Sequence, residues 1–311
     1  MTDPAHPATV EEAVQALRRG EPVILPTETV YGLACDAANP RAVAAVFEAK
    51  GRPRFNPMIA HVTGVEAAAR IAALDARALA LAEAFWPGPL TLVAPVREGA
   101  AVCDLARAGL DTVAVRAPDH AVFQAVLRDF GEPLAAPSAN RSGRPSPTTF
   151  ADAVAETGDR AGAALDGGPC RVGLESTVVG VYGDDLVLLR PGGVTRAEIE
   201  AVAGPMSSGG EAGRSPGRLA RHYAPEAPLR LEVERPTPGM AFLGFGPGPG
   251  GPLVWNLSPG GDLAEAAANL FAYLRAADRS GAPGIEAAPI PAHGLGEAIN
   301  DRLRRAAGQV G

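Results

Sequence analysis

The segment Lys50-Gly-Arg52-Pro-Arg54-Phe-Asn56-Pro57 gathers three cations and an amide in a loop that two prolines stiffen. Arginine binds phosphate oxygens in pairs through its planar fork, whereas lysine acts as a compact point charge. Lys50 is the only lysine among 311 residues, so every other basic side chain of this kind is arginine. The loop could therefore clamp a polyphosphate, although a solvated basic loop would have the same composition. No Walker A sequence occurs, so this would not be a P-loop site.

Polar side chains also follow short apolar segments. Thr27-Glu28-Thr29-Val30-Tyr31-Gly32 comes directly after the apolar residues 22–25. Ligands of open α/β sheets bind at the carboxyl ends of strands, so a site here is as good an interpretation as an ordinary polar turn. His61 lies in the apolar segment 58–62 and could be a satisfied core residue. Arg116 ends the segment 112–116 and could pair with a ligand carboxylate or with a surface acid.

Three later segments carry further candidates. A loop dense in turn-forming residues, Ser138–Thr149, could donate to a base, a ribose or a phosphate, or could simply be a turn. Glu175-Ser176-Thr177 and Arg190-Pro-Gly192 are equally ambiguous taken singly. The stretch Ser215–Pro225 contains Arg-His222-Tyr223 inside what reads as a linker, and functional residues concentrate in such connecting segments. No Cys/His cluster has metal-ligand spacing, and no Ser-His-Asp set stands out.

Composition and charge exclude several classes of protein. The chain is 47% hydrophobic and 20% charged, which indicates globular structure. Its net charge of −7 gives no basic field for non-specific nucleic-acid binding. The three cysteines are widely spaced and suit a reducing compartment. The acidic N-terminal segment does not resemble a signal peptide, and no apolar run approaches the ~18 residues of a membrane helix. We therefore expect a cytoplasmic protein.

The elements that would position these residues alternate between strands and helices. Capping patterns predict helices that begin after Thr9, at Asn39-Pro40, at Thr63 and at Thr195. The first two end at Gly20 and near Lys50, the third runs to about Phe85, and a further helix covers 121–130. The expected strands cover 22–25, 58–62, 90–96, 112–117, and a hairpin of 174–181 with 186–190.

A Gly/Ser/Pro-rich segment, residues 205–217, divides the chain into two domains. We expect a first domain over residues 1–204, a linker over 205–227 and a small α/β domain over 228–311. The small domain should contain strands near 229–233, 240–243 and 253–257, and helices near 263–277 and 296–307. The glycines of 244–251 fit a dinucleotide-binding spacing, but prolines crowd them and a strand follows where a helix should begin.

Taken in order, these segments resemble the threonylcarbamoyl-AMP synthase family of the two-domain type, with its YrdC-type catalytic domain. The matching segments are PTETVYGL (Pro26–Leu33), KGRPRFNP (Lys50–Pro57), PSANRSGRPSPTT (Pro137–Thr149), GLESTVV (Gly173–Val179), LRPGGVT (Leu189–Thr195), SPGRLARHYAP (Ser215–Pro225), NLSPGGDLAEAAANLF (Asn256–Phe271) and GLGEAINDRL (Gly294–Leu303). The resemblance implies a YrdC-type twisted mixed sheet with helices around a basic cavity, followed by a small Rossmann-like α/β domain.

The resemblance also implies a reaction. L-threonine, bicarbonate and ATP would combine into threonylcarbamoyl-AMP with release of pyrophosphate. Downstream proteins would transfer the threonylcarbamoyl group to the adenosine beside the anticodon of tRNA, so this chain need not hold nucleic acid stably. Mg²⁺ would arrive with ATP rather than at a dedicated protein site.

Roles follow for the residues at the motif positions. The resemblance implies that L-threonine is bound by Thr29, His61, Arg116 and Ser176. Lys50 and Arg52 would face the phosphates at the catalytic centre, together with Asn56. The rest of the nucleotide would be fixed by Thr112, Ser138, Asn140, Ser146 and Arg190. His222 or Tyr223 would reach it from the linker, which would act as a lid that excludes water.

Two other functions fit parts of the pattern. Carbamoyltransferases also contain YrdC-type domains, but they carry acylphosphatase-like or kinase-like domains that this sequence lacks. A non-catalytic RNA-binding module is the other alternative, and the net charge of −7 argues against it.

The single lysine provides a test. Lys50→Arg keeps the charge but replaces a point charge with a larger planar fork. From the sequence we expect a large loss of turnover with little loss of stability, measured by steady-state kinetics and thermal unfolding. Turnover near that of the wild type would mean that a lysine at this position is accidental.

Overall fold

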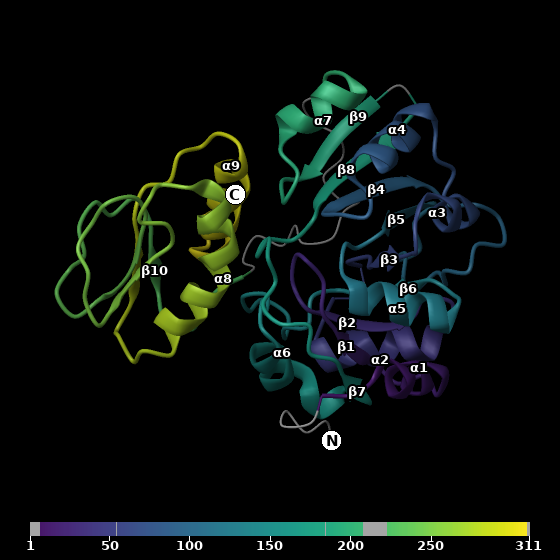
Figure 1. Cartoon of the computed structure of the whole chain (residues 1–311), viewed down its shortest axis with the longest axis horizontal. Coiled ribbons are helices and arrows are strands. Elements are labelled where there is room, and N and C mark those ends of the chain that lie inside the picture. The colour runs from purple at the N-terminus through teal and green to yellow at the C-terminus, as the bar shows by residue number, and fades with distance from the viewer. Residues whose placement is uncertain (1–6, 54, 184, 208–222, 310–311) are drawn as a thin grey trace.

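The computed structural model describes residues 7–53, 55–183, 185–207 and 223–309. Figure 1 shows them as two α/β domains that lie side by side. The last helix of the N-terminal domain is α7 (Arg196–Ala203), and the first strand of the C-terminal domain is β10 (Leu229–Arg230). The predicted linker falls between these two elements, and its residues 208–222 lie outside the described part.

A nine-stranded mixed sheet organises the N-terminal domain. Three neighbouring pairs of strands are parallel and the other five are antiparallel. The strands follow one another across the sheet as β7 (Ala163–Ala164), β1 (Val23–Leu25), β2 (Gly32–Asp36), β6 (Leu134–Ala135), β3 (Ile59–His61), β5 (Thr112–Arg116), β4 (Leu90–Pro95), β8 (Thr177–Tyr182) and β9 (Asp185–Arg190). This sheet confirms the expected twisted α/β class.

Helices cover this sheet, and several begin at the caps that the sequence indicates. Thr9 and Thr195 form capping boxes with Glu12 and Glu198, and the Asn39 side chain accepts from the first backbone N–H groups of its helix. The helices are α1 (Val10–Arg18), α2 (Pro40–Lys50), α3 (Val65–Ile71), α4 (Ala76–Phe85), α5 (Ala121–Phe130), α6 (Phe150–Thr157), the short 3₁₀ helix η1 (Gly158–Arg160) and α7.

The single helix expected from Thr63 to about Phe85 is wrong, because the chain forms α3 and α4 instead. Ala72 adopts an extended backbone and bridges to Val96, which ends α3, and Asp75 then caps α4. No side chain caps α3, so the capping box expected at Thr63 does not form. The sequence interpretation also missed α6 and the strands β2, β6 and β7, whose short lengths leave little periodicity to detect.

The C-terminal domain is a four-stranded parallel sheet with two helices, which confirms the Rossmann-like expectation. Its strands follow one another as β10, β13 (Ile285–Ala287), β11 (Ala241–Gly244) and β12 (Val254–Asn256), and its helices are α8 (Leu263–Asp278) and α9 (Leu295–Ala306). The glycine-rich residues 245–253 connect β11 directly to β12. No helix begins there, so the connection is not a dinucleotide-binding turn.

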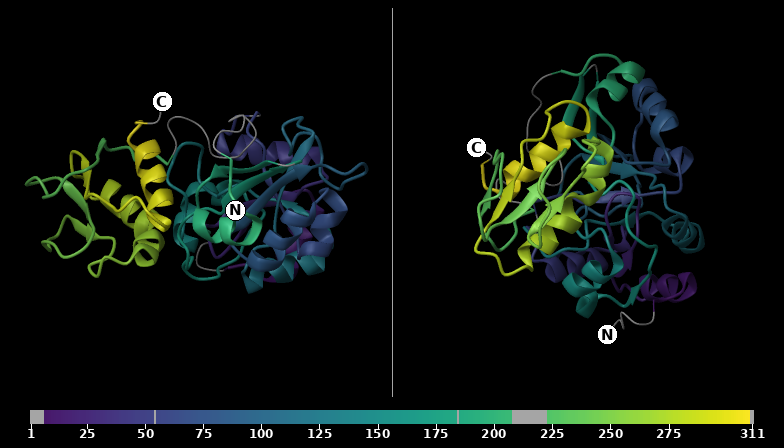
Figure 2. Two further views of the ribbon diagram at one scale, coloured as in Figure 1. Left: turned by 90° about the horizontal axis from the view of Figure 1, so that it is seen from above. Right: turned by 60° about the vertical axis from the view of Figure 1, so that its left-hand side comes forward.

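The two domains share an apolar core. Both α8 and α9 lie on the side of the small sheet that faces the N-terminal domain (Figures 1 and 2). Val30 and Leu174 of the N-terminal domain belong to the same buried cluster as Tyr223 and the α8 residues Leu270 and Phe271. Burial of apolar surface therefore fixes α8 and α9 against the large domain.

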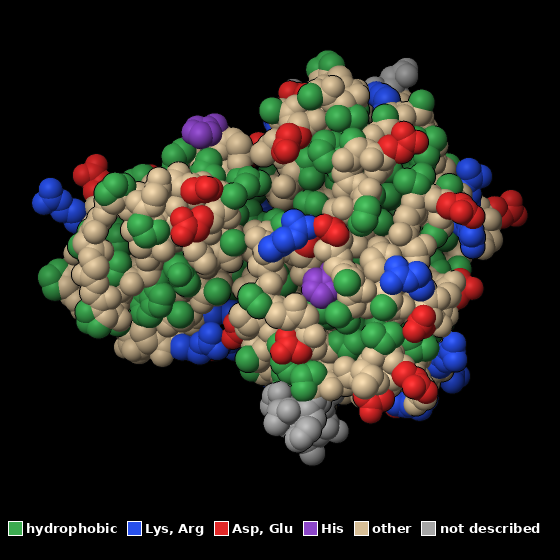
Figure 3. All heavy atoms as spheres, in the orientation of Figure 1, with side chains coloured by type: hydrophobic (Ala, Val, Ile, Leu, Met, Phe, Trp, Pro, Cys, Tyr) green, Lys and Arg blue, Asp and Glu red, His purple; other side chains and the backbone are tan. Residues whose placement is uncertain are grey.

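Charge is dispersed over the outside of the molecule. Acidic and basic side chains alternate over the face in Figure 3, and neither sign dominates a continuous area there. None of the described helices is long and apolar enough to cross a lipid bilayer.

A buried cationic cavity as the candidate active site

A cavity opens where β1, β3, β5 and β9 end and β8 begins, and Tyr223 contributes to its wall from the end of the linker. It brings together the predicted residues Thr29, Arg52, His61, Arg116, Ser138, Ser176, Arg190 and Tyr223. Its other lining residues are Thr27, Val30, Gly32, Pro57, Met58, Ile59, Ala136, Pro137 and Glu175.

The Thr27–Thr29 turn presents buried hydroxyl groups at the end of β1. The hydroxyl oxygens of Thr27 and Thr29 are 2.8 Å apart, and Thr27 Oγ1 donates to the carbonyl of Val30 at 2.6 Å. Thr27 Oγ1 also accepts from the backbone N–H groups of Thr29 and Val30, both at 3.1 Å. The side chain of Thr27 therefore shapes the turn, and Thr29 is held at the cavity wall with no exposed surface.

Arg116, the last residue of β5, forms a buried ion pair with Glu28. Arg116 Nη2 donates to Glu28 Oε1 at 2.6 Å, and the two side chains are 4% and 1% exposed. Arg116 Nε donates to the carbonyl of Gly88 at 3.1 Å, and Glu28 Oε2 accepts from the N–H of Asp119 at 3.1 Å. These contacts fix the guanidinium in one orientation, which suits it to receive a planar carboxylate.

His61 ends β3 and lies beside Arg116 in the parallel register of β3 and β5. Its Nδ1 lies 3.1 Å from the carbonyl oxygen of Ile59. Burial, together with the positive charge of Arg116, lowers the pKa of His61 to about 3. The imidazole is therefore neutral at physiological pH and adds a polar group without adding charge.

Ser176 and Arg190 meet across the hairpin of β8 and β9. Arg190 Nη2 donates to the carbonyl of Ser176 at 2.8 Å and to its hydroxyl at 3.1 Å, and that hydroxyl is 2.7 Å from Thr91 Oγ1. Gly192 permits this approach, because a Cβ there would lie 2.4 Å from the carbonyl oxygen of Glu175 and from the N–H nitrogen of Thr177. A side chain at residue 192 would therefore displace Ser176.

Arg52 adds a third guanidinium to the cavity wall, beside those of Arg116 and Arg190. It donates to the backbone carbonyls of Asn56 at 3.1 Å and Pro57 at 2.8 Å, so it braces its own loop. Burial lowers the pKa of Arg52 to about 10, and the nearby Arg190 acts in the same direction. Among the described lining residues the only carboxylate is Glu175, while Glu28 lies behind the wall and pairs with Arg116.

Lys50 lies behind this wall and is not among the lining residues. It ends α2, is 4% exposed, and its ammonium donates to the backbone carbonyls of Ser138 and Asn140. Burial first, and then the charge of Arg52, lower the pKa of Lys50 well below its usual range. In this structure the single lysine holds the 138–146 loop, and its predicted contact with phosphate stays a prediction.

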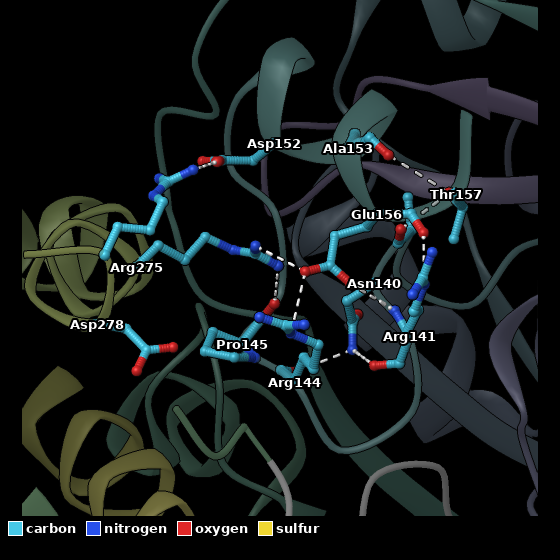
Figure 4. Close-up of polar contacts among 12 residues, drawn as sticks. Asn140, Arg141, Arg144, Pro145, Asp152, Ala153, Glu156, Thr157, Arg275 and Asp278 are labelled. Carbon is cyan, nitrogen blue, oxygen red and sulfur yellow. Dashed lines mark hydrogen bonds and ion pairs between the residues drawn. The ribbon is translucent and has the colours of Figure 1, made fainter. Parts of the chain in front are cut away.

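The 138–146 loop is held as a compact turn behind the cavity. Asn140, predicted to touch the nucleotide, accepts from the Ser138 hydroxyl at 2.5 Å and donates to the carbonyls of Arg141 and Arg144 at 2.8 and 2.9 Å. Glu156 of α6 accepts from the N–H of Arg141 at 2.9 Å, as Figure 4 shows. Asn140 therefore shapes the loop and does not line the cavity.

Ser146 also stays behind the wall, but it reaches the cavity through Glu175. Its hydroxyl donates to Glu175 Oε1 at 2.6 Å. The other carboxylate oxygen accepts from Arg302 Nε of α9 at 2.9 Å. Burial raises the pKa of Glu175, yet Arg302, Arg190 and the Ser146 hydroxyl outweigh it and keep the pKa below its usual value.

Two other predicted nucleotide contacts, Asn56 and Thr112, are buried and do not line the cavity. Asn56 Oδ1 and Thr112 Oγ1 have no hydrogen-bond partner in the described part of the chain. Such atoms are uncommon in folded proteins and are candidates for pairing with a ligand. His222, the remaining predicted residue, lies outside the described residues.

Sequence reasoning missed four contributors to the site. Thr27 and Glu28 stand inside a motif that it identified, but their burial gives no signal in a single sequence. Glu175 also belongs to a motif, yet the sequence assigns it no role. Arg302 lies in the C-terminal motif GLGEAINDRL, to which the sequence assigns no role, and it follows Ile299 by three residues and precedes Ala306 by four, on the buried face of α9. A charge within an apolar helical stripe is the signal that could have found it.

Comparison with known proteins adds independent evidence. Residues 15–192 match the protein family described as "Telomere recombination", and residues 194–308 match "Threonylcarbamoyl-AMP synthase, C-terminal domain". The threonylcarbamoyl-AMP synthase of Bacillus subtilis is 39% identical, over 96% of this chain and 93% of that protein.

Two solved structures of a Pyrococcus abyssi protein are similar over nearly the whole chain. The crystal structure of P. abyssi Sua5 complexed with L-threonine has a TM-score of 0.87 and 38% identity, covering 96% of this chain and 94% of that one. A variant of the same protein, with a histidine and the tyrosine after it replaced by alanine, also has a TM-score of 0.87 and 38% identity, covering 96% of this chain and 93% of that one.

The neutral state of His61 predicts a pH dependence of stability. Its pKa is about 3 in the folded protein and about 6.5 when unfolded, so below pH 6.5 the unfolded state binds a proton that the folded state does not. We expect His61→Gln to reduce the loss of unfolding free energy on acidification by up to about 1.4 kcal/mol per pH unit between pH 6 and 4. Urea titrations at several pH values measure it, with the exposed His293→Gln as control. Equal slopes for His61→Gln and wild type would contradict a neutral, buried imidazole.

The burial of Lys50 changes the expectation for Lys50→Arg. A guanidinium is larger than the ammonium that the two loop carbonyls enclose, and overpacking a buried position costs about 1–3 kcal/mol. We now expect this variant to lose stability as well as turnover. Thermal unfolding beside the kinetics measures both, and an unchanged melting temperature would contradict the observed position of the ammonium.

Proposed function

This chain belongs to the threonylcarbamoyl-AMP synthase family, and from that premise we propose that the cavity holds L-threonine beside the phosphates of ATP. The chain is a nucleotidyltransferase that joins L-threonine, bicarbonate and ATP into threonylcarbamoyl-AMP and releases pyrophosphate. The observation that supports the placement is the excess of buried guanidinium groups over carboxylates in one cavity. Buried charge without a partner is costly, and anionic substrates would supply the missing charge.

The threonine would lie between β1, β3, β5 and the start of β8. Arg116 would bind its carboxylate, because Glu28 and Gly88 already hold the guanidinium still. The hydroxyls of Thr29 and Ser176 and the neutral ring of His61 would pair with its amine and hydroxyl. A neutral imidazole suits this role, because the amine must be uncharged to attack and a neutral ring does not offer it a proton. The similar P. abyssi protein was crystallised as a complex with L-threonine, which supports this half of the proposal.

The phosphates would lie against the second group of cations. Arg52 and Arg190 line the wall, and Lys50 is one hydrogen bond behind it, on the carbonyl of Ser138. A modest movement of the 138–146 loop would bring the ammonium to a phosphate oxygen. The unpaired hydroxyl of Thr112 could donate to the nucleotide. The unpaired Oδ1 of Asn56 can only accept a hydrogen bond and a phosphate oxygen needs a donor, so a phosphate contact by Asn56 would use its amide nitrogen.

The reaction needs no nucleophile from the protein. Bicarbonate loses hydroxide to give CO₂, and that hydroxide takes the proton that the threonine amine loses, so water is released. The amine forms a C–N bond with the CO₂, which gives a carbamate. A carbamate oxygen then attacks the α-phosphorus, and the bond to the β-phosphate bridging oxygen breaks, so pyrophosphate leaves with its electron pair. The protein aligns the two reactants and places fixed positive charge where negative charge develops.

Mg²⁺ would enter as part of the ATP substrate. Among the described residues, no three His, Cys, Asp or Glu side chains gather as metal ligands would. The carboxylate in the cavity wall and the one behind it are already engaged, Glu175 by Arg302 and Glu28 by Arg116. Bound to the nucleotide, the ion would neutralise phosphate charge, and we assign it no protein ligand.

The linker would act as a lid. Tyr223, at its described end, lines the cavity and is 1% exposed, and burial raises the pKa of its hydroxyl to about 12. His222-Tyr223 is the only histidine–tyrosine pair in the sequence. Closing over the adenylate would keep water from a product that hydrolyses readily. The product would then pass to tRNA-modifying transfer proteins.

The test is pyrophosphate release from ATP. Release by the purified chain should need both L-threonine and bicarbonate, because the carbamate that attacks ATP is built from these two. Reactions that omit one substrate at a time, or replace L-threonine with glycine, are the controls, and mass spectrometry identifies the adenylate. Release that does not depend on threonine would overturn the proposal.

A further inference from the structure

Two carboxylates of the N-terminal domain each form an ion pair with an arginine of the C-terminal domain. Glu156 Oε1 accepts from Arg275 Nη1 of α8 at 2.9 Å, and Figure 4 shows this pair beside the 138–146 loop. Glu175 Oε2 accepts from Arg302 Nε of α9 at 2.9 Å. In both ion pairs the side chains are at most 8% exposed. Only Glu175 of these two acids lines the cavity.

Arg302 is itself fixed by its own domain. Its Nη1 donates at 2.7 Å to Asp301, which also accepts from Arg305 Nε at 3.0 Å. The Arg302 side chain is 1% exposed, and its guanidinium carbon lies 5.4 Å from the centre of the Tyr223 ring. Arg302 therefore contacts both Glu175 and Tyr223, two residues that line the cavity.

Each oxygen of Glu175 has a different partner. One accepts from the Ser146 hydroxyl and the other from Arg302, so the carboxylate is held at both ends. Without Arg302 a buried carboxylate would lose the cation beside it, and removal of one member of a buried pair is strongly destabilising locally. The carboxylate would then be free to turn towards Arg190 or to take up a proton, and it would no longer fix Ser146.

We propose that Arg302 of the C-terminal domain is a positioning residue for the active site, which fixes Glu175 and, through it, Ser146. This rests on the proposed function, together with the role in nucleotide binding that the family resemblance implies for Ser146. The C-terminal domain thereby becomes part of the catalytic apparatus, because its arginine sets the wall of the cavity on the nucleotide side. Among the described residues, no side chain of the C-terminal domain after Tyr223 lines that cavity directly.

The chain offers a matched control. Arg279 of α8 also crosses the domain interface and donates to Asp152 at 2.8 Å, but its side chain is 62% exposed and neither residue lines the cavity. Arg302→Met and Arg279→Met each remove one interdomain ion pair. We expect Arg302→Met to raise the KM for ATP at least tenfold, with less than a threefold change in the KM for L-threonine. Arg279→Met should stay within twofold of wild type for both.

A pH profile separates positioning from a general loss of structure. Arg302 helps to hold the pKa of Glu175 down, so its removal should move the acid limb of the kcat/KM profile for ATP to higher pH. Arg302→Lys keeps the positive charge, so its acid limb should lie close to that of the wild type. If Arg302→Met does not fold, Arg302→Gln is measured in the same way.

The outcomes are distinct. If the wild type releases no pyrophosphate with threonine and bicarbonate, the proposed function fails. If the wild type is active and the neutral Arg302 variants match Arg279→Met in the KM for ATP and in the acid limb, this inference alone is overturned. A lower melting temperature with an unchanged KM and pH profile would also overturn it, because it would assign Arg302 a structural role only.

Discussion

This site depends on one constraint: it buries more positively charged side chains than carboxylates. Arg52, Arg116 and Arg190 line a cavity at the ends of the strands of the large sheet, with Lys50 behind them, in a chain whose net charge is −7. Burial and mutual repulsion lower the pKa values of Lys50, Arg52 and Arg190. Taking such groups out of water is costly, so the fold must compensate for them and the ligand must complete the compensation.

The protein compensates for these buried cations with individual carboxylates and backbone carbonyls, each of which pairs with one cation. Glu28 neutralises Arg116, while Arg190 and Lys50 donate to carbonyls of Ser176 and of the 138–146 loop. The same contacts set the positions of the groups that would bind substrate. Stability and function are therefore coupled here, since the groups that stabilise the buried cations also define the shape of the cavity.

Much of this site could be predicted from sequence. Its motif residues lie at the ends of strands, and the apolar pattern of the sequence shows where those strands end. His61 and Arg116 close two parallel strands that lie side by side, and both line the cavity. The ion-pair partners could not be predicted, because a glutamate such as Glu28 looks the same in sequence whether it is buried or exposed. The contact of Arg302 with Glu175 could not be predicted either, because it depends on how α9 packs against the other domain. Lys50 is recognisably unusual in the sequence, but its contact with loop carbonyls depends on a loop 88 residues away along the chain.

The buried guanidinium groups of the cavity recognise chiefly the negative charge of its ligand. Calorimetric titration of the full-length protein with ATP, pyrophosphate and adenosine tests it most directly. We expect measurable binding of ATP and of pyrophosphate, both weakened by salt, and much weaker binding of adenosine. Adenosine that binds as tightly as ATP, with no effect of salt on either, would contradict it.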